Sequence, residues 1–120
     1  MKMRYFLLCL FLVITAVIFS GCNRAKVMDI VEDFYAYPNP FSNSVKFVYI
    51  PKNSGHANLA VYTVEGGLVK NLINQDIEAG KIYEVDWDGK NGDGNEVGGG
   101  MYLCKLTIGD GEKSIKILKN

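Results

Sequence analysis

The sequence predicts an all-β domain of seven strands, arranged as two antiparallel sheets that pack face to face. The first reason is composition, because 13 glycines with abundant Val, Ile, Tyr and Phe favour short strands and turns over helices. The second is spacing, because alternating apolar and polar stretches recur about every eight to twelve residues, with turn residues between them. The third is the only tryptophan, Trp87, which shares an apolar face with Tyr83 and Val85 while three acids occupy the opposite face, as in a half-buried strand.

The N-terminal residues have the form of a signal peptide. Met1–Arg4 is short and basic, and residues 5–19 form an apolar run that only Thr15 interrupts. The run is shorter than the roughly 20 residues of a membrane span and leads into Ser-Gly-Cys. Small residues before a cysteine resemble the lipobox of bacterial lipoproteins. We therefore expect residues 1–21 to be a lipoprotein signal peptide and Cys22 to be lipidated; an ordinary signal peptide or an uncleaved anchor is the alternative.

Residues 22–33 are expected to be a tether, because they are charged and lack a clear period, although their apolar residues could form a helical turn or a loose first strand. The folded domain is placed at residues 34–120. Its first strand is Phe34–Tyr37, and Pro38-Asn39-Pro40-Phe41 ends it because proline has no N–H to donate.

The remaining strands follow the same alternation. Glu65-Gly66-Gly67 joins two of them as a hairpin, and the polar segment Asn74–Gly80 is expected to cross between the sheets. Trp87 is expected to anchor the core. The strands are expected at Ser44–Ile50, Asn58–Val64, Leu68–Ile73, Lys81–Asp88, Gly100–Ile108 and Glu112–Leu118. The side chains expected to point inward include Val45, Phe47, Tyr49, Leu59, Val61, Tyr102, Cys104, Leu106 and Ile108.

Several short motifs occur in an order that resembles one known family. They are Tyr37–Phe41, Leu59–Val69, Ala79-Gly80, Trp87–Asn91 and Gly100–Tyr102. Together they resemble the Ig-like domain of the flagellar hook-capping protein FlgD and the related type A C-terminal sorting domains of type IX secretion cargo. The similarity covers about residues 34–120, and it implies an Ig-like or fibronectin-III-like sandwich without catalysis. The structural motif residues are Pro38, Asn39, Pro40, Phe41, Trp87, Asp88, Gly89, Gly100 and Tyr102.

The roles of those proteins are not transferred by this resemblance. A sorting domain follows a large cargo, and the hook-capping protein has a further N-terminal region; we expect neither in this chain.

An acidic, glycine-rich stretch suggests a calcium site. Its oxygen-bearing side chains do not follow the spacing of an EF-hand loop, because Lys90 or Glu96 falls at a required position. A loop whose Gly, Asn and Asp residues form turns explains the same residues. Both interpretations stay open for Asp86, Asp88, Asn91, Asp93 and Asn95.

No arrangement predicts an enzyme, a cofactor or a small-molecule substrate. His56 is the only histidine, and Glu84, Asp86 and Asp88 fit a solvated strand face better than a catalytic carboxylate pair. Cys104 is left alone once the leader and Cys22 are accounted for, so no disulfide is expected.

Charge and aromatic content limit the classes of partner that this chain could bind. Removing Lys2 and Arg4 leaves 11 basic against 13 acidic residues, so nucleic acid is not expected. A tyrosine face for carbohydrate or peptide requires that several of six tyrosines share one exposed sheet: Tyr35, Tyr37, Tyr49, Tyr62, Tyr83 and Tyr102.

Taken together, the leader, the fold and the motifs lead us to expect a lipoprotein of the cell envelope, held at the outer membrane or cell surface, that binds an envelope or secreted protein. The alternatives are a secreted sorting domain and, further off, a calcium- or carbohydrate-binding module.

Overall fold

The computed structural model describes residues 29–120, so the expected signal peptide and Cys22 lie outside the described part of the chain. Within residues 29–120 no helix is long and apolar enough to cross a membrane. The described residues form seven strands: β1 (Val31–Tyr37), β2 (Val45–Pro51), β3 (Gly55–Thr63), β4 (Leu68–Ile77), β5 (Tyr83–Trp87), β6 (Gly100–Ile108) and β7 (Gly111–Lys119).

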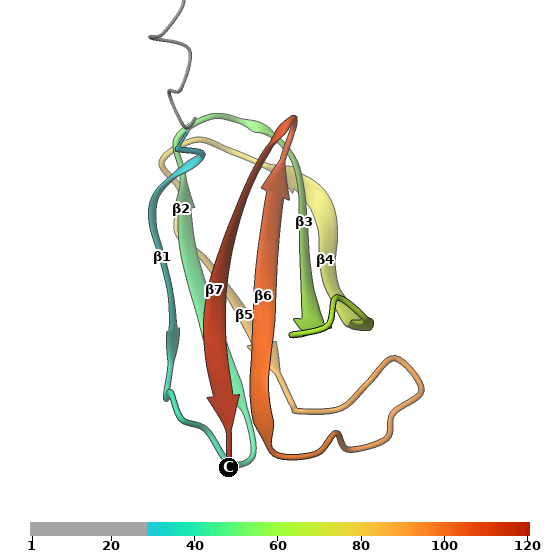
Figure 1. Cartoon of the computed structure of the whole chain (residues 1–120). Coiled ribbons are helices and arrows are strands. Elements are labelled where there is room, and N and C mark those ends of the chain that lie inside the picture. The colour runs from blue at the N-terminus through green and yellow to red at the C-terminus, as the bar shows by residue number, and fades with distance from the viewer. Residues whose placement is uncertain (1–28) are drawn as a thin grey trace, which may run out of the picture.

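The strands form two antiparallel sheets, as the sequence predicts. One sheet has the order β1-β2-β5 and the other has the order β4-β3-β6-β7. Figure 1 shows the two layers facing each other. Three strands facing four in this order is the Ig-like, fibronectin-III-like sandwich.

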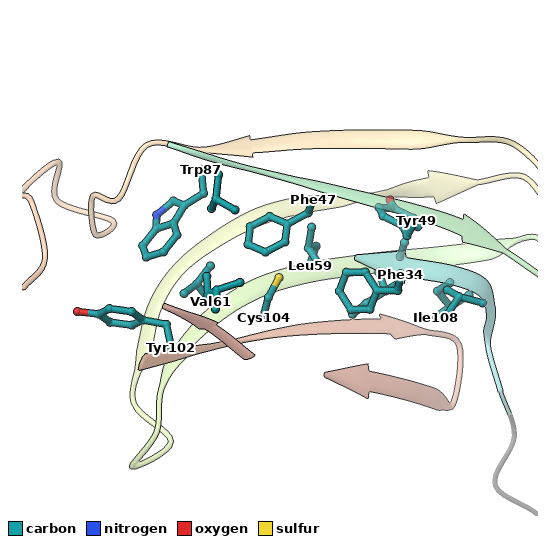
Figure 2. Close-up of a cluster of buried hydrophobic side chains, with 14 of the residues drawn as sticks. Phe34, Phe47, Tyr49, Leu59, Val61, Trp87, Tyr102, Cys104 and Ile108 are labelled. Carbon is teal, nitrogen blue, oxygen red and sulfur yellow. The ribbon is translucent and has the colours of Figure 1, made fainter. Parts of the chain in front are cut away.

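The core lies between the sheets and is filled by the alternate residues that the pattern assigned to the inside (Figure 2). Thr63, the last residue of β3, is only half-buried. Tyr83 and Val85 are also half-buried because β5 is the outermost strand of its sheet. The largest fully buried side chains are Trp87, Tyr49, Phe41, Phe47, Leu59, Leu106, Ile117, Val31, Val45, Val61, Pro51 and Cys104.

The sandwich begins before Phe34, inside the segment expected to be a tether. β1 starts at Val31, and the side chains of Ile30 and Val31 are buried. Ile30 covers the turn before β7, where a Cβ on Gly111 would lie only 2.2 Å from its Cγ2 atom. The charged residues Glu32 and Asp33 hid this strand, because a register shift between Val31 and Asp33 breaks the simple alternation.

The segment Asn74–Gly80 differs from its prediction as a crossing. Its first residues complete β4, where Asn74, Gln75 and Asp76 pair with β3. An edge strand with a solvated outer face needs few apolar residues, so polarity did not exclude a strand here. The crossing between the sheets is shorter and occupies residues 78–82.

The two termini of the described chain lie at opposite ends of the sandwich (Figure 1). Residue 29 enters at one end. The C-terminus, the segment 38–44 and the loop after β5 lie at the other.

Candidate interaction surfaces around the Trp87 end

Trp87 lies at the end of the sandwich where the C-terminus is also found. Its side chain has no exposed surface, and its Nε1 donates a hydrogen bond to the Lys90 carbonyl at 2.8 Å. Phe41 and Tyr102 pack on the indole with ring centroids at 5.5 and 5.6 Å. Residues from three separated motifs thus meet on one side chain. We call this cluster the Trp87 end.

The Pro38–Phe41 motif attaches to β7. The Asn39 side chain accepts a hydrogen bond from the Leu118 N–H at 2.9 Å and donates one to the Lys116 carbonyl at 3.3 Å. Phe41 adds two backbone bonds, from its N–H to the Leu118 carbonyl and from the Asn120 N–H to its own carbonyl, both 2.9 Å. The motif therefore covers the end of the β7 edge, and its role in this structure is architectural.

Gly89 is required by both its conformation and its neighbours. Its φ is +72°, in the left-handed region that favours glycine, and a Cβ would lie 2.9 Å from Cε of Lys119. The Lys119 side chain is itself buried at 6% exposure and forms an ion pair with Glu96 at 3.3 Å. Close packing of Gly89 against Lys119 explains why glycine follows Asp88 in the motif.

Residues 88–100, which we call the acidic loop, fold through local turns. Asp88 Oδ1 accepts a hydrogen bond from the Lys90 N–H at 3.1 Å. Asn91 Oδ1 accepts two, from the N–H groups of Asp93 and Asn95, both at 3.0 Å. The Gly92 N–H bonds to the Val69 carbonyl at 3.0 Å and so ties the loop to β4.

Three of the five residues considered for calcium have other partners or lie on different elements. Asp86 lies on the outer face of β5 beside Lys46, whereas Asp88 lies 3.9 Å from Lys70 Nζ. Asn91 is occupied by the two turn bonds above. Among residues 29–120, no group of three or more His, Cys, Asp and Glu side chains is placed to hold a metal ion.

A small open hollow lies between β4 and the acidic loop. Its volume is about 450 Å³, and it contains no histidine or cysteine. The lining residues are Leu68, Val69, Lys70, Asn71, Asn91, Gly92 and Asp93.

The residues considered for catalysis lie on different sheets: His56 is on the four-stranded sheet, and Glu84 and Asp86 are on the three-stranded sheet. His56 lies on the outer face of β3, bonded through its ring nitrogens to Asp76 (2.8 Å) and Asn74. The hydrogen bond to Asp76, followed by that to Asn74, raises the pKa of His56. Cys104 is buried in the core as predicted, and burial raises the pKa of its thiol.

Glu84 and Asp86 share the outer face of β5 and flank Lys46 of β2 at 3.4 and 3.9 Å. The hydrogen bond to Glu84, followed by the charge of Asp86, raises the pKa of Lys46. Asp88 does not join this pair, because it lies past the end of β5 and faces Lys70.

The six tyrosines do not form one face. Tyr49 and Tyr102 are buried, and Tyr83 is half-buried against Tyr49. Tyr35 and Tyr37 are exposed and stack on each other at 6.1 Å on β1, on the other sheet from Tyr62. The tyrosine-face hypothesis is therefore reduced to this single pair.

An apolar patch on the four-stranded sheet was not identified as a site from the sequence. The strand register places Leu68, Tyr62 and Leu103 in one row across β4, β3 and β6 on the outer face. Met101 and Leu118 pair beside this row, at 46% and 41% exposure. The signal was present, since Met101 and Leu103 occupy the outward positions of an alternating strand where polar residues are usual. We call these five residues the apolar patch.

Of the comparisons with known proteins, the one with solved structures finds similar folds. No family model matches the chain, and no curated protein matches it. A domain of dimeric latent PorU from Porphyromonas gingivalis is similar, with 22% identity, a TM-score of 0.58, and coverage of 79% of this chain and 10% of PorU. The shared feature is the fold.

Two further solved structures show the same likeness at 22% identity. PorZ, a surface component of the type IX secretion system of P. gingivalis, has a TM-score of 0.52, over 74% of this chain and 12% of PorZ. The hook-capping protein FlgD from Xanthomonas campestris has a TM-score of 0.50, over 74% of this chain and 63% of FlgD. The chain therefore spans about a tenth of PorU and PorZ and less than two thirds of FlgD.

Proposed function

We propose that this chain is a non-enzymatic lipoprotein of the cell envelope, anchored through Cys22, whose Ig-like domain binds another envelope or secreted protein through the apolar patch. The observation that carries the binding role is the row of Leu68, Tyr62 and Leu103 on an outer sheet face. Leu68 is exposed, and Tyr62 and Leu103 are half-buried, so the row leaves part of its apolar surface open. Contiguous exposed apolar surface marks interaction sites. The anchor rests on the leader and its final cysteine.

The surroundings of the apolar patch suit a protein partner. Lys105 Nζ lies over the Tyr62 ring at 5.1 Å, and Lys116 occupies the β7 position of the same row. Among the described residues Lys105 pairs with Glu112, whereas Lys116 has no ion pair. An apolar centre with a polar rim is the usual composition of a protein interface.

The position of the apolar patch supports the same role. The chain enters the domain at residue 29, at the end opposite the C-terminus (Figure 1). Leu68 follows the turn into β4, and Met101 and Leu118 lie near the β6 start and the C-terminus, so the patch belongs to the far end. A lipid on Cys22 would then leave the patch directed away from the membrane.

The anchor is tested by intact mass and detergent partitioning of the natively expressed protein beside Cys22→Ala. The expected result is the mass of a lipidated, acylated cysteine and partition into detergent, both lost in the variant, because buried acyl chains contribute about 0.8 kcal/mol per CH₂. An unlipidated mature chain in the medium would overturn the anchor.

The binding surface is tested by photo-crosslinking in the cells that make the protein. A crosslinking residue at Leu103 is expected to give a defined adduct that Leu68→Asp abolishes. The matched control places the same residue at Asn58, which is exposed at the other half of the same sheet face. Equal adducts from both positions would remove the assignment to the patch.

The second candidate is a sorting domain read by a secretion apparatus, which the likeness to domains of PorU and PorZ supports. It predicts that the chain, with Cys22→Ala and fused behind a reporter protein, carries that reporter across the outer membrane. Retention of the reporter in the periplasm would leave the first proposal standing.

A further inference from the structure

A two-sheet sandwich has four edge strands, which here are β1, β5, β4 and β7. Unpaired N–H and C=O groups along such an edge can pair with an added strand, and proteins protect edges with bulges, prolines or covering segments. The four edges of this domain differ in that protection.

Two edges of the larger sheet are protected. The motif at Asn39 and Phe41 covers the end of β7 through four hydrogen bonds. β4 has two register shifts against β3, and the Gly92 N–H occupies the Val69 carbonyl. An incoming strand would therefore meet register shifts on β4, and on β7 it would meet an edge that is covered from Lys116 onward.

The β1 edge is closed at both of its ends. A register shift lies between Val31 and Asp33, and Asp29 bonds to Lys113 of β7 at 3.4 Å across the gap between the sheets. At the other end Pro38 has no N–H to donate, and the following residues bind β7.

β5 has none of these devices. It pairs with β2 in an unbroken register from Tyr83 to Trp87. Within residues 29–120 its backbone forms no hydrogen bond outside that ladder. Since alternate residues of an antiparallel strand direct their N–H and C=O groups away from the partner, half of these groups face outward. In immunoglobulin domains the corresponding sheet has a fourth strand beside this one. The geometry of the sandwich therefore leaves room for an added strand next to β5.

The side chains of β5 define what such a strand should carry. On the outer face, Glu84 and Asp86 are 53% and 71% exposed and share the single cation of Lys46. On the inner face, Tyr83 and Val85 are half-buried at the rim of the core. A cross-strand partner should therefore place Lys or Arg opposite the two acids and apolar residues opposite the rim.

We propose that β5 is the open edge of this domain and pairs with an extended segment of another protein in which basic and apolar residues alternate. Main-chain hydrogen bonds hold the segment, and the charges set its register. This surface lies on the other sheet from the apolar patch, so it goes beyond the proposed function and does not depend on it.

The test uses the full chain in detergent and the capped peptide acetyl-Thr-Lys-Val-Lys-Val-Lys-Thr-amide. Binding is expected to protect β5 amides from hydrogen exchange and to leave β4 and β1 amides unchanged. The same peptide with every amide N-methylated is expected not to bind, because it cannot complete the ladder. Protection on another edge, or equal binding of the methylated peptide, would overturn the proposal.

Charge reversal provides the second readout. The double variant Glu84→Lys with Asp86→Lys is expected to weaken peptide binding about tenfold, since two favourable cross-strand pairs become repulsive. The matched control Glu65→Lys with Asp110→Lys makes the same change of net charge at two exposed turns of the other sheet and is expected to bind as the parent chain does. Equal weakening in both would show nonspecific attraction and overturn the assignment to β5. Leu68→Asp should keep peptide binding, which separates this result from failure of the apolar patch.

Discussion

Two buried aromatic residues at opposite ends of the β2–β5 pair are held in different ways. Trp87 and Tyr49 both have no exposed surface, and the register puts Trp87 opposite Val45 and Tyr49 opposite Tyr83. The Trp87 N–H has a carbonyl partner, whereas the Tyr49 hydroxyl has no hydrogen-bond partner among the described residues.

The difference shows where the sequence motifs act. Around Trp87, loops supply directed hydrogen bonds and a close glycine contact. Around Tyr49, packing comes from Phe34 at 6.4 Å and Tyr83 at 5.3 Å, and burial, followed by the charge of Tyr83, raises the pKa of Tyr49 to about 12. Directed hydrogen bonds hold the Trp87 end in place, whereas the Tyr49 end is held by aromatic packing.

The largest effect is expected from Trp87→Ala. It removes a fully buried indole that contacts Phe41 and Tyr102, so the free energy of unfolding should fall by about 3–5 kcal/mol. Urea unfolding followed by circular dichroism measures this change. Trp87→Phe keeps a ring but leaves the Lys90 carbonyl without its donor, so its free energy of unfolding should lie between those of Trp87→Ala and the parent. An unchanged free energy of unfolding in Trp87→Ala would refute Trp87 as the core anchor.

Gly89→Ala is expected to lower the free energy of unfolding by about 1–2 kcal/mol. The cost comes from a Cβ in the left-handed region, and the displaced Lys119 side chain acts in the same direction. Gly98→Ala is the control, because a Cβ there meets no atom within 4 Å and should change stability by less than about 0.5 kcal/mol. Equal stability of both variants would show that Gly89 is not required.

Tyr49→Phe should raise the free energy of unfolding by about 1 kcal/mol, because it removes a buried hydroxyl that has no partner in the described chain. Tyr102→Phe is the matched comparison: its hydroxyl donates to the Gly98 carbonyl, so its loss should cost about 1 kcal/mol. Thermal unfolding is expected to show a higher melting temperature for Tyr49→Phe and a lower one for Tyr102→Phe than for the parent. Destabilisation by Tyr49→Phe would mean that the two ends of the core are equally satisfied.

The smallest effect is expected from pH, through His56. Its pKa is raised in the folded chain by Asp76 and Asn74, so its stabilising contribution is complete below the unfolded pKa and is lost as pH rises through the folded pKa. The parent should therefore be slightly more stable relative to His56→Gln at about pH 5.5 than at about pH 8.5. The same difference in an Asp76→Asn background would show that the Asp76 bond is not its cause.

The sequence by itself determined the sandwich. Alternation identified the inner faces of β2, β3 and β6, the buried positions of Trp87 and Cys104, and the hairpin at Gly66, because period-two burial and turn chemistry are local. It was incomplete at Val31 and wrong about a crossing at Asn74. Both segments lie at sheet edges, where one solvated face and a register shift remove the alternation.

Only the tertiary structure decided which residues from distant motifs meet and which edges remain open. Asn39 reaches β7 across 79 positions of the chain, and Gly92 reaches Val69 from a loop that contributes no strand. The apolar patch likewise depends on register between β4, β3 and β6. Such contacts are set by how the two sheets close over one core, and no local period encodes the pairing of separate strands.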